Sequence, residues 1–340
     1  MPELTVDLVG DVNLRRHVES DAAGLTDVAP ELAMADARLA NLEGCFAASE
    51  AALADKQGWF HCQPEMAKLL VGNFDLVSCA NNVHHPDVVG ESLQVLDELG
   101  IPHTGAGANL EEAHRPAVMP LGEMRLGVLG YTSIFQTEGQ EATASRPGVA
   151  TIKAHTSYEV NPRVMLRPGS PAIVRTWADP GELARACADV KGLREEVDLL
   201  VVYMHFGVSS SPEIHDYQKE IAHALVEAGA DVVAGSHSHT IGGVEFYDRG
   251  VIFYGLGNFI FNTGFLPHAT RDGALAKLSV RDGAVADVAL LPTYRAPGDR
   301  TKFVDPSTSD GARLAEMIVS RSAGLGTETE VLPGRVRLLR

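Results

Sequence analysis

The 340-residue sequence predicts an α/β fold made mainly of strand–helix units, with a β-rich part in its last third. Apolar runs of about four to eight residues recur, and each is followed by a turn signal and then a helical pattern. In the last third, short apolar runs are instead joined by Asp-Arg-Gly and Arg-Asp-Gly, which are typical of antiparallel hairpins. With 45% hydrophobic and 21% charged residues, the chain has the composition of an ordinary globular protein.

The first half is expected to alternate strands with one clear helix. Strands are predicted over 4–9, 75–79 and 125–130. Asp87 is expected to cap a helix whose apolar face includes Leu93 and Leu96. Gly100 follows that helical pattern and is expected to end it.

The second half begins with elements that fit a sheet buried on both faces. A helix over 181–193 leads into 197–204, a run so uniformly apolar that both faces of the strand are expected to be covered. Pro212 is expected to open the next helix, and a buried strand over 231–234 follows it. The remaining elements expected are strands over 244–247, 251–254, 276–280 and 285–291, and a helix over 310–320.

These elements are expected to form one domain over 1–295, with a C-terminal helix and tail over 296–340 packing on it. The stretch 143–180 interrupts the pattern, because it is rich in Ser, Thr, Pro, Gly and Arg and has little periodicity. We expect a long loop or lid there rather than a linker, since strands of the same layered type flank it on both sides.

Charge and composition argue against several functions. With 28 basic and 45 acidic residues the net charge is −17, which opposes non-specific binding to nucleic acid or to an anionic membrane. Four cysteines without a CxxC pair give no support for a zinc ribbon or a disulfide scaffold. No apolar stretch approaches the ~20 residues of a membrane span, and the N-terminus lacks the pattern of a signal peptide. We therefore expect a soluble, cytoplasmic protein with no membrane span and no nucleic-acid partner.

Polar residues gather where the predicted strands stop. They are Asp11 after the first strand, Glu43 after the next apolar segment, Asn81-Asn82-Val83-His84-His85 after the third, His205 after 197–204, and His237-Ser238-His239 after 231–234. In an open α/β sheet, ligands bind at the carboxyl ends of the strands. Taken singly, most of these residues are typical of a turn or of a buried core position. Their occurrence together, each at a strand end, predicts a convergent site.

The residue types suit a pair of divalent metal ions. Carboxylate and amide oxygens are hard ligands, neutral imidazole suits Fe and Zn, and carboxylate suits Mn. A carboxylate can bridge two cations, and two metals about 3.5–4 Å apart can activate a water for in-line displacement. No thiolate is needed, which agrees with the absence of cysteine from the segments just named.

These segments resemble a known family. The matching pieces are Gly10-Asp11, Asn41-Leu42-Glu43, Ala80-Asn81-Asn82, His205-Phe206-Gly207, Gly235-Ser236-His237-Ser238-His239 and Tyr254-Gly255-Leu256-Gly257-Asn258-Phe259. Together they are similar to the bacterial capsule synthesis CapA family, also called the poly-γ-glutamate synthesis family, of the calcineurin-like metallophosphoesterase superfamily. The resemblance covers residues 4–292, most of the chain. It implies a four-layer α/β/β/α sandwich of the metallo-dependent phosphatase type.

The resemblance also implies roles for the residues that match it. Asp11 and His239 would hold one metal ion, Asn82, His205 and His237 would hold the other, and Glu43 would be the bridging carboxylate. The two divalent ions would be Mn, Fe or Zn. His84 would be the general acid near the leaving group. In the alternative without metal, Asp11 with a nearby histidine would transfer the proton at a substrate Cα. Asn81, Tyr217 and Asn258 would lie on the substrate side.

The sequence departs from the family pattern at two places. The family has His directly after the Asn pair, whereas here Val83 separates Asn82 from His84. Because His84 keeps the family's spacing to Asp87, Val83 is interpreted as an insertion, which would either turn His84 away or place His85 in its role. The family's Gly-His-His-Pro-His also becomes Gly-Ser-His-Ser-His, which keeps the ligand pair and changes its surroundings.

Three functions remain open from the sequence. The first is a hydrolase whose dinuclear metal centre activates water against a phosphoester or amide-type bond. The second keeps the scaffold without metal and tailors a peptide, by epimerase-like proton transfer at a Cα. The third is a non-catalytic accessory protein of poly-γ-glutamate or capsule-type polymer synthesis. The expected partner is a small-molecule or peptide substrate, glutamate-containing ones included, because fold alone does not fix the substrate.

Overall fold

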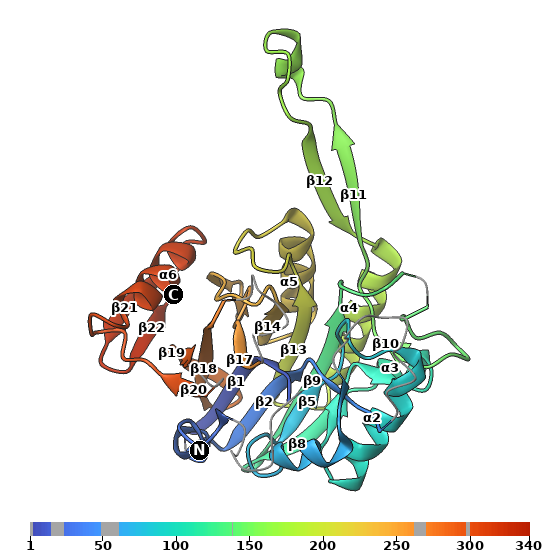
Figure 1. The fold of residues 1–340 in the computed structure, drawn as a ribbon, viewed down its shortest axis with the longest axis vertical. Coiled ribbons are helices and arrows are strands. Elements are labelled where there is room, and N and C mark those ends of the chain that lie inside the picture. Colours follow the sequence, from blue (N-terminus) through green and yellow to red (C-terminus); the bar gives the residue numbers. More distant parts are fainter. Residues whose placement is uncertain (1–2, 15–23, 49–60, 138, 262–269, 297–299) are drawn as a thin grey trace.

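The structure, a computed structural model, describes residues 3–14, 24–48, 61–137, 139–261, 270–296 and 300–340. Two β-sheets pack face to face at its centre (Figure 1). The first sheet has the order β21 (Glu328–Leu332), β22 (Arg335–Leu339), β19 (Ala284–Arg295), β18 (Asp272–Arg281), β1 (Leu4–Val12), β2 (Ala37–Leu42), β5 (Leu76–Ser78) and β6 (His103–Thr104), with β17 (Asn258–Ile260) beside β1 and β20 (Thr301–Phe303) beside β19. The second has the order β15 (Val244–Tyr247), β16 (Gly250–Phe253), β14 (Val232–His237), β13 (Leu199–Phe206), β9 (Met124–Thr132) and β8 (Ala117–Leu121).

Helices and short ribbons complete the fold. The α-helices are α1 (Ala29–Leu32), α2 (Pro86–Glu98), α3 (Leu110–Ala113), α4 (Pro180–Arg194), α5 (Asp216–Ala228) and α6 (Ala312–Ala323), and 3₁₀ turns are η3 (Pro64–Leu69) and η4 (Pro162–Met165). Outside the two large sheets, β3 (Cys45–Phe46) pairs with β4 (His61–Cys62), β7 (Ala106–Gly107) with β10 (Gly148–Val149), and β11 (Ala154–Glu159) with β12 (Ile173–Ala178). Among the described residues, no helix combines the length and the apolar character that crossing a membrane requires.

Alternating side chains on the central strands build a core on both sides of each sheet. Val201 of β13 belongs to the cluster packed between the sheets, and its neighbour Val202 packs outward with Leu225 of α5. On the other sheet, Val9 of β1 packs outward with Leu96 of α2. The result is the four-layer α/β/β/α sandwich that the resemblance implied, and this fold prediction is confirmed.

The parallel strands end together at one edge of the sandwich. β1, β2 and β5 are parallel in the first sheet, and β9, β13, β14 and β16 are parallel in the second. The expected hairpins are also present, because β15 pairs antiparallel with β16 and β18 with β19. Beyond them, β22 adds to the first sheet by pairing with β19.

The first strand runs further than its apolar pattern predicts. β1 continues through Gly10 and Asp11 to Val12, and it pairs with β2 along this extension after one register shift. Gly10 is needed there, because a Cβ at this position would lie 2.0 Å from the carbonyl oxygen of Gly257. Asp11 is therefore a strand residue and not part of a turn.

Two helix starts differ from the predicted ones. The helix expected to open at Pro212 begins at Asp216, because proline is compatible with a helix start but does not force one. Asp87 does not cap α2, since this helix begins at Pro86 and Asp87 lies in its first turn. Gly100 follows α2 with a φ of +67°, as expected for a residue that ends a helix.

The stretch expected to be an irregular loop or lid carries a projecting hairpin. β11 and β12 pair antiparallel, from Ala154 opposite Ala178 to Glu159 opposite Ile173, and they stand out from the body (Figure 1). The hairpin has no alternation of apolar and polar residues, because its side chains have no core to face, and so the sequence predicts no strands there. We call residues 154–178 the arm.

Candidate metal centre

The strand register brings polar residues together at the carboxyl-end edge. Asp11 of β1 is flanked by Asn41 of β2 and by Asn258 of β17. In the second sheet, His205 of β13 lies directly beside Ser236 of β14. His205 continues the inward-facing alternation of β13, so its ring points between the two sheets.

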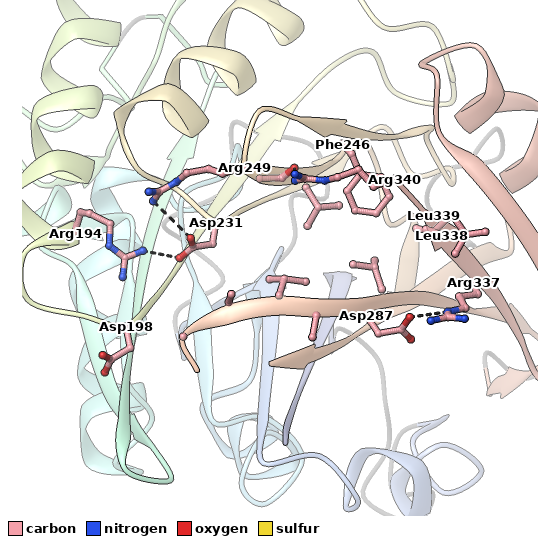
Figure 2. A pocket seen from close by; sticks show the side chains of 17 residues that line it. Arg194, Asp198, Asp231, Phe246, Arg249, Asp287, Arg337, Leu338, Leu339 and Arg340 are labelled. Carbon is pink, nitrogen blue, oxygen red and sulfur yellow. Dashed lines mark hydrogen bonds and ion pairs between the residues drawn. The ribbon is translucent and has the colours of Figure 1, made fainter. Parts of the chain in front are cut away.

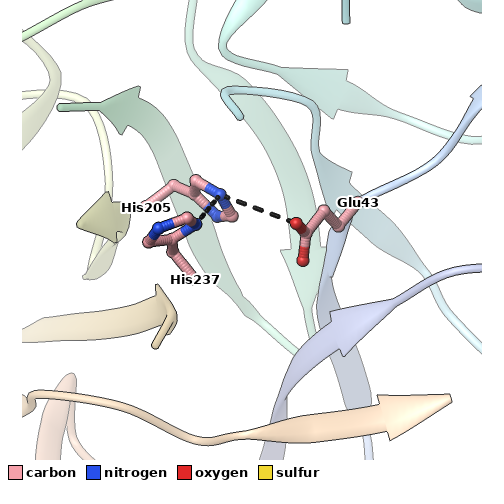
Figure 3. A group of neighbouring side chains, drawn as sticks. All are labelled: Glu43, His205 and His237. Carbon is pink, nitrogen blue, oxygen red and sulfur yellow. Dashed lines mark hydrogen bonds and ion pairs between the residues drawn. The ribbon is translucent and has the colours of Figure 1, made fainter. Parts of the chain in front are cut away.

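Glu43 is the side chain that the two halves of the centre share. Its Oε1 lies 3.9 Å from Nε2 of His205 and 3.8 Å from Nε2 of His239. The rings of His205 and His237 face each other (Figure 3), with Nδ1 of His237 3.1 Å from Nε2 of His205. Nδ1 of His239 lies 3.3 Å from Oδ2 of Asp11. Two donor groups result, Glu43 with His205 and His237, and Glu43 with Asp11 and His239, each with its donor atoms within 4.8 Å. The resemblance divides these residues in the same way, and their role as metal ligands stays a prediction.

Burial sets the charge state of the centre. These five side chains are at most 9% exposed. Burial, followed by the charge of Asp11, raises the pKa of Glu43 well above its usual value. Burial also lowers the pKa of His205 well below its usual value, and it lowers the pKa of His237 to about 3, with neighbouring histidines adding to both effects. Neutral imidazoles keep a lone pair available for a metal ion.

Ser236 fixes the orientation of His205. Its hydroxyl lies 2.9 Å from Nδ1 of His205, and on the other side of the ring Nε2 lies 2.9 Å from Oδ1 of Asn82. A hydrogen bond at one imidazole nitrogen determines which nitrogen is presented to a metal. The serine that departs from the family pattern therefore still supplies a partner for a candidate ligand.

Asparagines on either side of Asp11 support the other half of the centre. Oδ1 of Asn258 lies 2.9 Å from Nδ1 of His239, which leaves Nε2 of His239 toward Glu43. Asn41 donates from Nδ2 to Oδ1 of Asp11 at 2.8 Å. In the sequence, Asn41 stands out only as part of the Asn41-Leu42-Glu43 motif, because its contact with Asp11 depends on the strand register. The substrate-side role expected for Asn258 stays a prediction.

The 81–85 loop reaches the centre through Asn82 and is held by Asn81. Nδ2 of Asn81 donates to the carbonyl of Leu42 at 2.7 Å, and its Oδ1 lies 3.0 Å from Nδ1 of His84. Gln140 adds two longer hydrogen bonds, to the carbonyls of Asn81 and His84. Gln140 carries no sequence signal, because it lies outside every motif and every predicted strand. The substrate role of Asn81 stays a prediction.

His84 is buried, and one of its two ring nitrogens, Nε2, lacks a hydrogen-bond partner among the described residues. Burial lowers the pKa of His84 to about 3, with smaller contributions from His85 and His103. A neutral His84 with Nδ1 engaged can accept a proton at Nε2, and it can act as an acid only after taking one up. His85 instead directly precedes α2.

Tyr217 holds the segment that follows β13. Its hydroxyl accepts a hydrogen bond from the backbone N–H of Gly207 at 2.7 Å, two residues beyond His205. The side chain is 6% exposed. The structure thus shows a positioning contact, and the substrate contact expected for Tyr217 stays a prediction.

The turn after β14 has an unusual backbone. His237 has a φ of +79° and His239 a φ of +52°, both in the left-handed region that residues other than glycine seldom adopt. Strained conformations of this kind persist only where the surrounding structure enforces them, and they cluster at functional sites. This turn brings both imidazoles to the same centre.

A separate cavity lies at the other end of the same strands. It has a volume of about 690 Å³ and is lined in part by Asp231, which directly precedes β14 (Figure 2). Arg194 and Arg249 pair with Asp231 at 2.6 and 3.5 Å. Because β13 and β14 carry His205 and His237 near their carboxyl ends, this cavity is not part of the candidate metal centre.

The donor set fits a pair of divalent cations. It combines two carboxylates, three imidazoles and an amide oxygen, which suit Mn, Fe or Zn. Oε2 of Glu43 is buried and has no hydrogen-bond partner within the described parts of the chain. Such an orphaned oxygen on the shared carboxylate is what a cation would satisfy.

The fold and this centre define a class of protein: an α/β/β/α sandwich with a buried carboxylate–histidine cluster at its strand ends. A family model described as "Bacterial capsule synthesis protein PGA_cap" matches residues 5–263. The chain therefore belongs to the bacterial capsule synthesis protein family, and the family prediction is confirmed.

Individual relatives are similar over most of the chain. It is 28% identical to "Capsule biosynthesis protein CapA" of Bacillus anthracis, over 85% of this chain and 67% of that protein. It is 26% identical to "PGA biosynthesis protein CapA" of Bacillus subtilis, over 85% and 71%. A "Probable polyglutamine synthesis accessory protein" of Mycobacterium tuberculosis is 26% identical, over 70% and 59%. Among solved structures, TT1561 of Thermus thermophilus aligns with a TM-score of 0.41 at 10% identity, over 81% of this chain and 94% of that chain.

Proposed function

We propose that this protein is a metal-dependent hydrolase that cleaves a phosphoester or an amide-type bond. The observation that carries the proposal is the position of Glu43, which is shared by two groups of metal-ligating side chains and has one oxygen unsatisfied. Two divalent ions bound there would supply an activated water and would neutralise charge developing on the bond that is cleaved.

The chain's own residues divide this work between holding and orienting. Asp11 and His239 would hold one ion, and His205 and His237, with the amide oxygen of Asn82, would hold the other. Their supporting hydrogen bonds to Ser236, Asn41 and Asn258 are already formed, so little reorganisation is needed when the ions bind.

His84 is the residue that we propose moves a proton. Its open Nε2 can take up a proton as water attacks and return it to the leaving group. Burial lowers the pKa of His84 to about 3, so the ring is neutral before the reaction and its unpartnered Nε2 is available to a proton. The Nδ1 contact with Asn81 keeps the ring in one orientation during both transfers.

The relatives' descriptions suggest which substrates to test first. Two of them are named for biosynthesis of capsule or PGA, and the mycobacterial relative is named an accessory protein of polyglutamine synthesis. We therefore propose glutamate-containing peptides beside simple phosphoesters as the first substrates. The same descriptions support a second candidate function, a non-catalytic accessory role in synthesis of such a polymer.

Asp11→Asn with Asp7→Asn as its control tests the proposal. Both changes replace a buried carboxylate by an amide on β1, but only Asp11 lies in the centre, whereas Asp7 pairs with Lys277 at 3.0 Å. Wild type and Asp7→Asn should each bind about two Mn or Zn ions and hydrolyse substrate. Asp11→Asn should lose metal and activity together.

Four results would count against the hydrolase. A wild-type chain that stays empty after Mn and Zn are supplied would contradict the metal centre. Turnover by Asp11→Asn in chelator would contradict the metal dependence. Metal binding without hydrolysis of any phosphoester or glutamyl peptide would leave the accessory role as the better proposal, and chelator-insensitive deuterium exchange at a peptide Cα would indicate epimerase-like chemistry.

A further inference from the structure

The arm is a two-stranded ribbon without a third strand. Among the described residues, the arm is tied to the body at its base, where Oγ1 of Thr176 accepts from the backbone of Tyr217 at 3.3 Å and the backbone of Ala178 donates to Glu220 at 2.8 Å. In the part of the chain that the structure describes, β11 has β12 as its sole strand neighbour. A two-stranded ribbon alone in water is marginally stable, so this element lacks the support that sheets normally have.

Large apolar side chains are concentrated on the arm. Six of the ten exposed large apolar residues among the described positions lie there: Tyr158, Val160, Met165, Leu166, Val174 and Trp177, which are 40–88% exposed. Tyr158 lies opposite Val174 on one face, and Trp177 lies opposite His155 on the other. Exposed apolar surface gathered in this way marks an interaction site.

The arm differs in charge from the rest of the protein. It carries Arg163, Arg167 and Arg175 against a single acidic residue, Glu159. The net charge of the arm is therefore +2. Because the whole chain has a net charge of −17, the rest of the chain carries −19. The arm is thus complementary in charge to the body of the same protein.

We propose that the arm joins two copies of this chain by antiparallel pairing of β11 with β11 of the second copy. A two-fold axis at Ser157 makes a four-stranded sheet and keeps each residue on its own face. It places Tyr158 beside Thr156 of the second copy, which is a favourable aromatic–β-branched pair.

The outer edge of β11 is the edge left for this pairing. β12 contacts α5 through Thr176 and Ala178, so α5 already covers the base of this strand. In the antiparallel arrangement, the tip with Arg163 and Arg167 extends toward the body of the other copy. The positive tip and the negative body then attract each other, which a parallel arrangement would not allow.

A second copy fits the arm better than a lipid surface does. The unpaired backbone groups of β11 can be satisfied by another strand but not by lipid tails. The exposed apolar residues lie on both faces and at the tip, whereas insertion into a bilayer would use the tip alone. The charge of −17 also opposes approach to an anionic membrane.

Mass in solution and a site-specific crosslink test the dimer. Sedimentation equilibrium of the full chain should give twice the 36.2 kDa of one copy at micromolar concentration. In Ser157→Cys, the two Cα atoms at the axis would lie about 4.5–5.5 Å apart, within the range of a disulfide. Mild oxidation should therefore give a covalent dimer, whereas Ser170→Cys, also on the arm, should crosslink no better than wild type.

A pair of exposed apolar residues provides a matched comparison. Tyr158→Asp should weaken the dimer at least tenfold, whereas Met34→Asp, 73% exposed and outside the arm, should leave it unchanged. A protein that is still monomeric at about 100 micromolar, where a dimer with a micromolar Kd would be mostly formed, would overturn the proposal. So would a dimer that tolerates Tyr158→Asp and does not crosslink through Ser157→Cys. Arm-dependent binding of the monomer to phosphatidylglycerol vesicles would overturn it in favour of a lipid partner.

Discussion

Nδ1 of His205 lies 2.9 Å from the hydroxyl of Ser236, its direct neighbour on the adjacent parallel strand. The two side chains point the same way because residues in register on adjacent strands share a face. The contact leaves Nε2 of His205 toward Asn82 and the centre. It is the clearest example here of a strand setting the orientation of a candidate ligand.

Ser236→Ala should therefore weaken metal binding without unfolding the protein. Loss of the partner that orients a ligand commonly lowers metal affinity by roughly 10–100-fold. Calorimetric titration with Mn²⁺ measures this change. Ser238→Ala is the control, because the Ser238 hydroxyl donates to the carbonyl of Thr240 and, among the described residues, forms no hydrogen bond with a histidine ring. Equal affinities in the two variants would contradict the orienting role of Ser236.

Glu43→Gln should have opposite effects in the metal-free and metal-loaded protein. The amide removes a carboxyl that is buried beside Asp11 and whose pKa is raised, so the metal-free variant should be at least as stable as wild type. It also removes the ligand shared by both donor groups, so added Mn²⁺ should raise its melting temperature far less. Thermal unfolding with chelator and with Mn²⁺ compares the four states, and an undiminished metal-induced shift would show that Glu43 is not a ligand.

Gly10→Ala should be strongly destabilising, and Gly90→Ala should be stabilising. A Cβ at position 10 would lie 2.0 Å from the carbonyl oxygen of Gly257, and that backbone cannot move without disturbing β1 and β17. Overpacking of this kind costs about 3 kcal/mol. Gly90 lies in α2 with open space around it, so alanine there should add about 1 kcal/mol through helix propensity. Urea unfolding of wild type and both variants measures the change in the free energy of unfolding, which should be negative for Gly10→Ala and positive for Gly90→Ala.

Because of Asp7, the free energy of unfolding of the protein should decrease as the pH rises from about 4 to 6. Burial raises the pKa of Asp7 to about 6 from its ordinary 3.8, although Lys277 opposes the shift. In this window the folded state binds more protons than the unfolded state, so the free energy of unfolding decreases with increasing pH. The full effect of one such group is about 3 kcal/mol.

Asp7→Asn should flatten this pH dependence. Urea unfolding of wild type and variant at pH 4, 5, 6 and 7 measures the two slopes. The slopes should differ most between pH 4 and 6 and should converge above about pH 7, where Asp7 is ionised in both the folded and the unfolded state. Parallel slopes through the whole range would show that Asp7 does not titrate near pH 6.

The layered fold and the clustering of the candidate ligands could be predicted because both follow from strand patterns. A continuous apolar strand such as 197–204 shows where a buried strand is, and His205 directly after it marks the strand's end. The structure brings together Asp11, Glu43 and His205, which the motifs had placed at separate strand ends. Parallel strands in one sandwich end at one edge, and this geometry needs no side-chain detail.

The supporting contacts could not be predicted, because they depend on register and on backbone geometry. Nothing in the order of residues shows that Ser236 lies beside His205, or that β1 passes Gly10 with a register shift. The two strands of the arm could not be predicted either, because they face water and lack a periodic apolar pattern. Gln140 supports the 81–85 loop from an irregular segment, where sequence patterns carry little information.

The left-handed conformations of His237 and His239 have a consequence for how this protein can change. Each costs of order 1–3 kcal/mol that glycine at the same position would avoid, so the turn is a local weakness kept for its two rings. Selection for heat resistance alone would favour glycine at these positions, and selection for activity would remove it. Stability and function are therefore expected to oppose each other within three consecutive residues, and homologues that have abandoned the chemistry should be recognisable by a glycine there.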